Sequence, residues 1–244
     1  MLRQFIIGLV VLGFVGAGLI GTVWAAGPDL AKVKAQLEKN VQGVEIGEVN
    51  TTPVPGLFEV EINDQLVYLT EDGRYMIRGD IYDRETSTNL SELSRSKIRL
   101  EILKEIDDDQ TIAYGPKKAE HTITVFTDTS CGYCRKLHNE EVPKLTEQGV
   151  KVRYLLFPRA GMDSPGYKEL QSIWCAKNPQ EALTKAKQGQ QVPEKTCDNP
   201  IAEHMSLAQT FGLRGTPLMV TDKGTLINGY RPADQLLEIL KSGQ

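Results

Sequence analysis

The chain has 244 residues, a formal net charge of −4 at pH 7 and a hydrophobic content of 40%. These values are typical of a folded protein with a substantial core, arranged as one large domain or two small ones. The charge is mildly negative and no basic block stands out, which excludes the electrostatic pattern of a nucleic-acid binder. We therefore expect no nucleic-acid partner.

Residues 1–25 predict an export signal. Arg3 precedes an apolar run that carries no charge from Phe5 until Asp29, and the run ends near Ala25 with the residue spacing that a signal peptidase recognises. The run is also long enough to span a bilayer, so a retained membrane anchor is the alternative to a cleaved signal peptide. Both alternatives place the rest of the chain outside the cytoplasm, because Arg3 stays inside.

Residues 26–86 predict a small α+β domain. An apolar stripe from Leu30 to Leu37 indicates a helix over residues 28–40. Short β-rich runs follow over residues 57–83, separated by Asn-Asp and Asp-Gly turn signals, and they predict an antiparallel sheet. The core of so small a domain is marginal, and pairing with a second copy would help to cover it.

Residues 87–112 predict a linker helix. The segment has a polar start, and its apolar residues Leu90, Leu93, Leu100 and Leu103 give the helix one apolar face. An ordinary helix that packs on its own domain has the same pattern, so the sequence leaves both interpretations open.

Residues 113–244 alternate between strand and helix. A buried strand over 121–127 leads into a Cys-x-x-Cys helix, which Pro143 is expected to kink. A second buried strand over 150–157, a helical insertion over about 163–211, a hairpin and a final helix follow. This order resembles the thioredoxin fold, so the expected fold class is α+β for the first domain and α/β for the second.

The four cysteines follow the predicted export signal, and an even number in an oxidising compartment suggests two disulfides. A zinc site is one alternative, but structural zinc sites pair two close-spaced knuckles, and Cys175 and Cys197 are widely split. An inert disulfide between Cys131 and Cys134 is another, although so short a loop gains little stability from closure. We expect no metal and no cofactor, and we expect a structural disulfide between Cys175 and Cys197 in the insertion.

The Cys131–Cys134 pair favours redox chemistry. A cysteine at a helix N-terminus faces unpaired N–H groups and the positive end of the helix dipole, which favour the nucleophilic thiolate. We expect Thr129 and Ser130 to cap the turn, Cys131 to be the exposed sulfur, and Cys134 to be buried and slower to react. His138 follows on the same helix, and a packed or solvated side chain is a better interpretation of it than a proton carrier.

Thr216 and Pro217 stand just before the last hairpin, where thioredoxin-like folds carry a cis-proline against the active cysteines. We expect a cis peptide bond here rather than an ordinary trans bond. The backbone of Thr216 would then pair with an extended substrate strand beside Cys131. Gly132 and Tyr133, between the two cysteines, are expected to contact the substrate as well.

Several motifs together resemble those of the DsbC branch of bacterial periplasmic protein disulfide isomerases, within the thioredoxin superfamily. These motifs are HTITVFTDTSCGYCRKLH, VRYLLFPRAG, IWCAK, RGTPLMV and YLTEDGRYMIRGDIYD. The resemblance covers nearly the whole exported chain and implies a periplasmic homodimer. Each protomer would have an N-terminal dimerisation domain (26–86), a linker helix (87–112) and a thioredoxin-like catalytic domain (113–244).

The resemblance also implies roles for individual residues. Cys131 would be the nucleophile and Cys134 the resolving cysteine, the strand from Ile77 to Gly79 would lie at the dimer interface, and Thr216-Pro217 would clamp the substrate. The partners would be misfolded disulfide-containing exported proteins and a membrane thiol reductase of the DsbD type. The expected function is thiol–disulfide isomerisation, and the alternatives are a DsbA-type thiol oxidase and a holdase chaperone.

Overall fold

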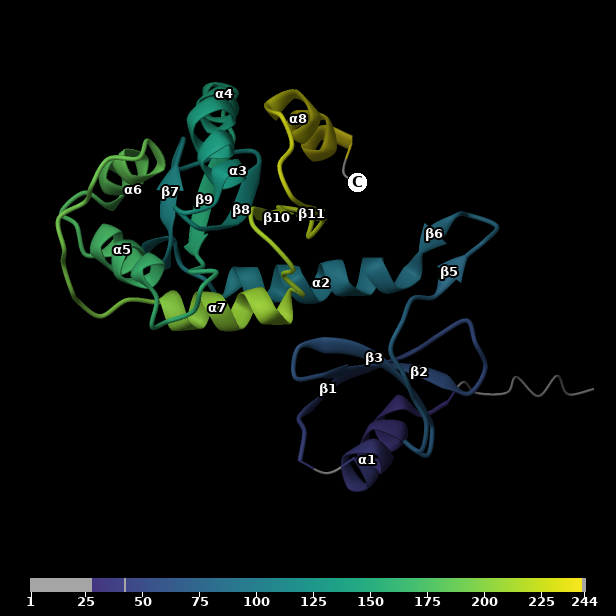
Figure 1. Ribbon diagram of the computed structural model, residues 1–244. Helices are drawn as coiled ribbons and strands as arrows, with labels where there is room; N and C mark the ends of the chain where they lie inside the picture. Colours follow the sequence, from purple (N-terminus) through teal and green to yellow (C-terminus); the bar gives the residue numbers. More distant parts are fainter. Residues whose placement is uncertain (1–27, 42, 243–244) are drawn as a thin grey trace, which may run out of the picture.

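The computed structural model describes residues 28–41 and 43–242. The predicted signal peptide or membrane anchor, residues 1–25, lies outside these residues. Within the part of the chain that is described, no helix is long and apolar enough to cross a membrane. The described chain forms a small N-terminal domain and a larger C-terminal domain, with a long helix between their sheets (Figure 1).

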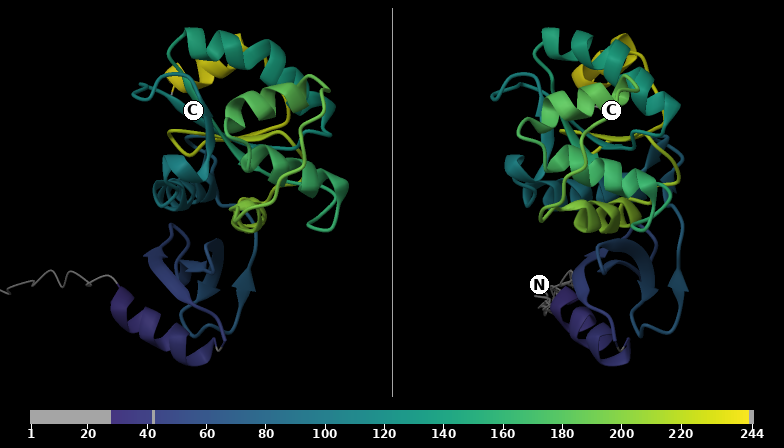
Figure 2. Two further views of the ribbon diagram at one scale, coloured as in Figure 1. Left: turned by 90° about the vertical axis from the view of Figure 1, so that its left-hand side faces the viewer. Right: turned by 60° about the vertical axis from the view of Figure 1, so that its left-hand side comes forward.

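The N-terminal domain packs one helix against a four-stranded antiparallel sheet. Asp29 caps the helix, and Val33 and Leu37 on its inner face are buried against apolar residues of the sheet. Figure 2 shows this helix beside the small sheet from two sides. The elements, in the order of the chain and of the sheet, are α1 (Leu30–Asn40), β1 (Ile46–Thr51), β2 (Leu57–Ile62), β3 (Gln65–Thr70) and β4 (Met76–Ile77).

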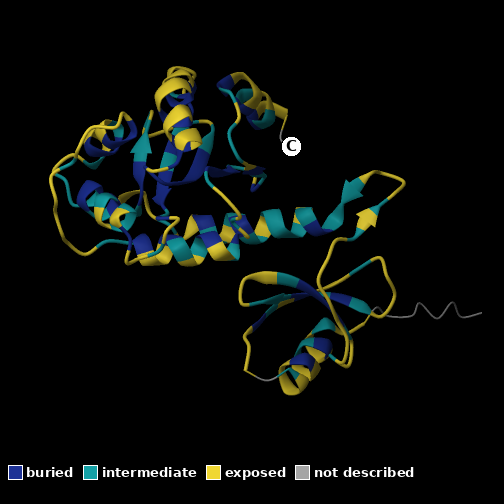
Figure 3. Ribbon diagram, in the orientation of Figure 1, coloured by how far each residue is buried: buried dark blue, intermediate teal, exposed yellow. Residues whose placement is uncertain are grey.

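The predicted β-rich run over residues 74–83 does not form one strand. Its first part is the two-residue strand β4, and its second part is β5 (Tyr82–Asp83), which pairs with β6 (Thr88–Asn89) in a separate hairpin. Strand β1 was not predicted, because Gly47 and Asn50 give it a poor strand composition. Both residues of β4, at the edge of the sheet, are exposed, whereas the central strands of the C-terminal sheet are mostly buried (Figure 3).

The linker region forms helix α2 (Leu90–Lys104), which contacts both domains. At its start, the Ser91 hydroxyl lies 2.5 Å from the Tyr68 hydroxyl of β3. At its end, Leu103 packs on the C-terminal sheet, and the guanidinium of Arg153 donates to the carbonyls of Leu103 and Ile106. The helix therefore links the two domains and also packs on the C-terminal domain. Both interpretations of its sequence, a linker helix and a helix packed on a domain, hold in part.

The C-terminal domain has a five-stranded sheet with helices on both faces. Its two central strands, β8 (Thr122–Thr127) and β9 (Lys151–Leu156), run parallel, and the other three pair antiparallel. The sheet order is β11 (Leu226–Asn228), β10 (Leu218–Thr221), β8, β9 and β7 (Ile112–Tyr114). The short 3-10 helix η1 (Asp108–Gln110) precedes β7, which falls across the domain boundary expected at residue 113.

Alternate residues of the central strands face two separate clusters of buried side chains. Val125 lies in the larger cluster, which includes residues of α4, α5, α6 and α8, whereas Phe126 lies in the smaller one, against residues of α2 and α7. The helices are α3 (Gly132–Lys136), α4 (Val142–Glu147), α5 (Pro165–Trp174), α6 (Pro179–Lys187), α7 (Ile201–Thr210) and α8 (Ala233–Ser242). The predicted strand and helix order of the thioredoxin fold is thus present.

The helix after the cysteines is interrupted, as predicted, near Pro143. Between α3 and α4 the backbone takes a π-helical turn, η2 (Leu137–Glu141), and Pro143 stands in the first turn of α4. A proline has no N–H to donate to the preceding turn, and a π turn before it accommodates the missing hydrogen bond.

The predicted helical insertion consists of the three helices α5, α6 and α7. An irregular segment over residues 190–199 joins α6 to α7. Cys175, just after α5, forms a disulfide with Cys197 in this segment, with a Cα–Cα distance of 5.8 Å. The predicted disulfide between Cys175 and Cys197 is therefore present. Helix α6 lies inside the loop that this disulfide closes.

Candidate active site

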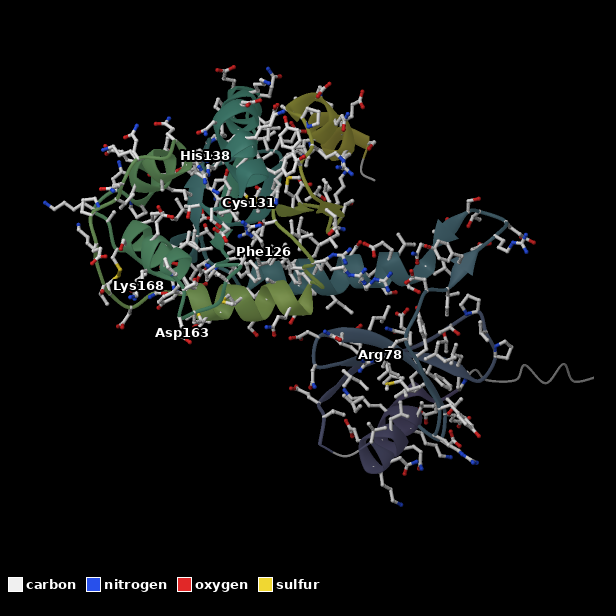
Figure 4. All side chains as sticks on the ribbon, in the orientation of Figure 1. Arg78, Phe126, Cys131, His138, Asp163 and Lys168 are labelled. Atoms are coloured by element: carbon white, nitrogen blue, oxygen red, sulfur yellow. A yellow bond between two sulfur atoms is a disulfide. The ribbon has the colours of Figure 1, made fainter. Side chains whose placement is uncertain are left out.

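Cys131 lies in the connection between strand β8 and helix α3, at the start of the helix (Figure 4). Its sulfur caps the helix, because Sγ accepts a hydrogen bond of 3.3 Å from the backbone N–H of Cys134. The expected caps, Thr129 and Ser130, do not fill this position. The Ser130 N–H donates instead to Asp128, and the Thr129 hydroxyl donates to the Glu169 carboxylate.

The two sulfurs are free thiols, and both are buried. Cys134 is 0% exposed, as predicted, but Cys131 is only 4% exposed, so the prediction that it would be the exposed sulfur was wrong. The reason is the Thr216-Pro217 segment, whose peptide bond is cis as predicted. The Cys131 thiol donates to the Thr216 carbonyl at 3.2 Å, across a sequence separation of 85 residues.

The two thiols have opposite shifts in acidity. Burial raises the pKa of the Cys131 thiol, but the side chain of Thr216, hydrogen bonding with Cys134 and the positive charge of Arg159 lower it, and the balance lies below the ordinary value. Burial also raises the pKa of Cys134, and there it outweighs the opposing charge of Lys187. Since the thiolate is the nucleophilic form, Cys131 is the better nucleophile of the two at neutral pH.

Asp128 and Arg159 hold the turn before Cys131, and neither was predicted from the sequence. The buried Asp128 carboxylate accepts hydrogen bonds from the N–H and hydroxyl of Ser130 and from the N–H and guanidinium of Arg159. Burial raises the pKa of this carboxyl, but the four hydrogen bonds outweigh burial and hold it low. The two residues follow the ends of β8 and β9, which are parallel neighbours, and that placement was a usable signal.

A buried polar group lies behind the cysteines, on the side of helix α6. His138 lies between the hydroxyls of Tyr154 and Thr184, at 3.0 Å from each. Burial and the nearby charge of Lys187 lower the pKa of His138 to about 4, so the ring is neutral at neutral pH. The interpretation of His138 as a packed side chain is confirmed.

Tyr133 is the exposed side chain at the mouth of the site, with an exposed fraction of 65%. Its ring lies 6.1 Å from that of Tyr230, centroid to centroid, and the Lys136 ammonium lies 4.9 Å from the Tyr230 centroid. Beside it, Gly132 borders open space, since a Cβ added there would meet no atom within 4 Å. The surface next to Cys131 is therefore aromatic and open on one side.

The zinc alternative is contradicted at two of its four cysteines. Among the described residues, no group of three or more His, Cys, Asp or Glu side chains could hold a metal ion. The zinc alternative needed thiolates at Cys175 and Cys197, and both sulfurs are held in the disulfide.

Two family models match the chain. A thioredoxin-like domain matches residues 108–244, and the N-terminal domain of disulfide bond isomerase proteins matches residues 24–92. The first match begins at η1, ahead of strand β7. The two matched regions correspond to the two domains of the fold.

Curated relatives match over most of their length. The chain is 38% identical over 214 residues to the thiol:disulfide interchange protein DsbC of Dickeya dadantii, covering 87% of each chain. It is 36% identical over 218 residues to the protein of the same name from Escherichia coli K12, covering 88% of this chain and 89% of that one.

Solved structures match about three-fifths of the chain. A disulfide interchange protein from Neisseria gonorrhoeae is 33% identical with a TM-score of 0.50, over 57% of this chain and 99% of that one. A linker-deletion mutant of Proteus mirabilis ScsC is 22% identical with a TM-score of 0.54, over 62% of this chain and 83% of that one, which shows a shared fold.

Proposed function

The chain belongs to the DsbC family of thiol:disulfide interchange proteins, and from this membership we propose that it corrects wrong disulfides in exported proteins, with Cys131 as the attacking thiolate. It is a disulfide isomerase with a thioredoxin-like domain. The roles of Cys131 and Cys134 are proposed from the geometry of these two free cysteines. Cys131 caps a helix and is the more acidic thiol, while Cys134 lies inside the same turn.

The proposed chemistry is thiol–disulfide exchange. The Cys131 thiolate attacks one sulfur of a client disulfide, forms a mixed disulfide and releases the other client sulfur as a thiolate. A second client thiol then attacks the mixed disulfide and leaves with a rearranged pairing. If rearrangement stalls, Cys134 attacks Cys131, and the client departs reduced.

The client-binding surface in this proposal lies around the mouth of the site. The Thr216 carbonyl, which touches the Cys131 sulfur, marks where an extended client strand would run. Gly132 leaves room beside it, and the exposed Tyr133 ring offers a sequence-tolerant apolar contact. To approach Cys131, a client disulfide displaces the thiol from its hydrogen bond with Thr216.

We further propose that two copies of the chain pair through the N-terminal domain. The strand β4 lies at the edge of its sheet, and Tyr75, Met76 and Ile77 are exposed by 58%, 53% and 51%. An unpaired edge strand with apolar side chains invites a second strand. Two catalytic domains on one dimer would hold a client by two weak contacts with a raised effective concentration.

The proposed location is the periplasm. It is supported by the predicted export signal in residues 1–25 and by the disulfide between Cys175 and Cys197, a bond that persists in oxidising compartments. An isomerase there must be kept reduced, and a membrane thiol reductase of the DsbD type is the proposed electron source.

The DsbA-type oxidase alternative is not favoured, because the chain carries the N-terminal domain of disulfide bond isomerase proteins. The holdase alternative is compatible with isomerisation, since the dimer surface that holds a client needs no thiol.

The reduction potential of the Cys131–Cys134 pair tests the proposal. A value near that of protein disulfide isomerase, about −180 mV, is expected, and a value near that of DsbA, about −120 mV, would restore the oxidase. A matched variant with Cys131→Ser and Cys134→Ser measures holdase activity separately, as suppression of aggregation of a reduced client.

A further inference from the structure

Lys187, at the end of α6, is a buried cation that the reaction described above does not use. Its side chain is 1% exposed. The ammonium donates to the hydroxyl of Thr127 at 2.5 Å and to the backbone carbonyl of Asp128 at 3.0 Å. Both partners are uncharged at these atoms, so no direct ion pair offsets the burial of the charge. A buried charge without a paired carboxylate is costly and needs a reason.

The groups that face Lys187 belong to the redox centre. Thr127 is the last residue of strand β8, and Asp128 follows it, three positions before Cys131. The ammonium lies 5.9 Å from the centre of the Tyr154 ring on β9. The titratable and charged groups that interact with it are Cys131, Cys134, Asp128, Arg135, His138 and Tyr154.

Two hydrogen bonds join helix α6 to the π-helical turn η2, which follows α3. The Thr184 hydroxyl bonds to His138, and the Asn139 amide donates to the Lys187 carbonyl at 3.1 Å. The Cys175–Cys197 disulfide closes the loop that contains α6. The insertion therefore holds the ammonium in a fixed place behind the cysteines.

Among the charges around Cys134, that of Lys187 has the largest effect. Burial raises the pKa of the Cys134 thiol, and the Lys187 charge is the main influence that lowers it. Burial lowers the pKa of Lys187 itself to about 8, with Cys134 as the main opposing influence. Lys187 is thus mostly charged at neutral pH, and its charge and that of a Cys134 thiolate favour each other.

We propose that Lys187 is a positioning residue for the release step: its ammonium stabilises the thiolate of Cys134 and so sets how fast a stalled client leaves in reduced form. This inference rests on the proposed isomerase function. In the step, the Cys134 thiolate attacks Cys131, the Cys131–client bond breaks, and a Cys131–Cys134 disulfide forms. The client leaves as a thiolate and takes up the proton that Cys134 lost, while Lys187 stays protonated.

The consequence is a choice between two outcomes for a bound client. A stable Cys134 thiolate shortens the life of the mixed disulfide and favours reduction. A less stable Cys134 thiolate lengthens the life of the mixed disulfide, so that a client thiol has more time to attack it, and this favours rearrangement. Lys187 thereby adjusts the share of clients that are reduced rather than isomerised.

The test is a stopped-flow reaction of the reduced full-length protein with 5,5′-dithiobis(2-nitrobenzoate). Attack by Cys131 releases a first thionitrobenzoate, and attack by Cys134 on the mixed disulfide releases a second, so the two steps are seen separately. Lys187→Met should slow the second phase about tenfold at pH 7, the effect of about one pKa unit in Cys134, and leave the first within about twofold. The second phase of the variant should approach the wild-type rate at high pH, where Cys134 is ionised in both proteins.

Lys185→Met is the matched control, since Lys185 is an exposed lysine on the same helix that pairs with Glu181. It should change neither phase. Lys187→Gln, run in parallel, removes the charge but keeps a polar group for Thr127, and it should behave like Lys187→Met. An unchanged second phase in either folded variant, or one slowed equally at every pH, would overturn the inference. A first phase that keeps the wild-type rate in Cys131→Ser would instead overturn the assignment of Cys131 as the nucleophile.

Discussion

The N-terminal domain covers one face of its sheet with a single helix, whereas the C-terminal domain covers both faces of a larger sheet with helices. The N-terminal domain leaves the edge strand β4 with its apolar side chains exposed. The C-terminal domain instead buries charged and polar groups, including Asp128, Lys187 and both free thiols. The N-terminal domain thus exposes apolar side chains, and the C-terminal domain buries polar and charged ones.

This difference indicates a division of labour. Exposed apolar surface in a small domain marks an interaction site, and buried polar groups around a thiol pair adjust its reactivity. We therefore assign the chemistry to the C-terminal domain, and the proposed dimer of N-terminal domains would hold the clients. Helix α2 connects the two, since it contacts β3 at one end and the catalytic sheet at the other.

Loss of Cys131 should have the largest effect. Cys131→Ser removes the attacking sulfur and should lower exchange to the uncatalysed background, whereas Cys134→Ser should retain attack and accumulate mixed disulfides with exported cysteine-rich proteins. Non-reducing gels of cells that express each variant give the measurement. Adducts trapped by Cys131→Ser but not by Cys134→Ser would reverse the two roles.

Disruption of β4 should separate the two functions. Ile77→Asp places a charge on the exposed edge and should give a monomer that reduces simple disulfides normally but loses about tenfold in unscrambling rate, because the two-site hold is lost. Sedimentation and a scrambled-substrate assay measure the two effects. Val54→Asp is the matched control, since Val54 is also an exposed apolar residue of the N-terminal domain but lies in the connection between β1 and β2. A dimeric Ile77→Asp would place the interface elsewhere.

Acid should weaken the C-terminal domain through its two buried histidines. Burial lowers the pKa of both His138 and His204 to about 4, from an ordinary value of 6.5. The stability that neutral imidazoles confer is complete above pH 6.5 and is lost as the pH falls from 6.5 towards 4, because only the unfolded chain takes up protons there. The loss amounts to about 3 kcal/mol per histidine.

Urea unfolding followed by Trp174 fluorescence measures this loss, since the Trp174 ring lies 6.3 Å from that of His204 and reports on the C-terminal domain. His204 is held by the Leu156 N–H and the Gln110 carbonyl, so His204→Gln should lower the stability at pH 7 and reduce its dependence on pH. A stability that stays constant from pH 6.5 to 4.5 would contradict the prediction.

The contact of α2 with the catalytic domain should be sensitive to one glycine. A Cβ on Gly224, in the turn between β10 and β11, would lie 2.3 Å from the Ser96 carbonyl oxygen of α2, and the Arg99 guanidinium donates to the Gly224 carbonyl. Gly224→Ala should therefore cost about 2 kcal/mol more than Gly212→Ala. Gly212 is a matched control because it also has a positive φ but meets no atom within 4 Å. Equal melting temperatures for the two variants would show that α2 is not held here.

The smallest effect is expected at Arg159. Its charge lowers the pKa of Cys131, so Arg159→Gln should raise this pKa and slow alkylation of Cys131 a few-fold below pH 7. Arg159→Lys keeps the charge and should restore part of the rate. The pH profile of iodoacetamide reaction measures both variants, and a profile that does not move in Arg159→Gln would remove Arg159 from the account.

Local sequence patterns predicted most of the catalytic fold. The buried strands β8 and β9, the helix that starts at the cysteine pair, the interruption near Pro143 and the final hairpin all have strong periodicity or turn signals within a few residues. The short strands β1 and β7 were missed, because six or fewer residues of mixed polarity give no clear period.

The site was predicted less completely, because its missing parts are set by distant segments. The burial of Cys131 depends on Thr216, 85 residues away, and Asp128 meets Arg159 only because β8 and β9 are parallel neighbours. Lys187 gave no sequence signal at all. It stands on an amphipathic helix among other polar residues, where a lysine is normally solvated.

The most direct test of the central claim is the refolding of a scrambled multi-disulfide protein by the purified chain. The account predicts that the wild-type chain recovers native activity of the substrate well above background, that Cys131→Ser stays at background, and that Ile77→Asp recovers it about tenfold more slowly despite normal reduction of simple disulfides. Recovery by Ile77→Asp at the wild-type rate, or by Cys131→Ser above background, would contradict it.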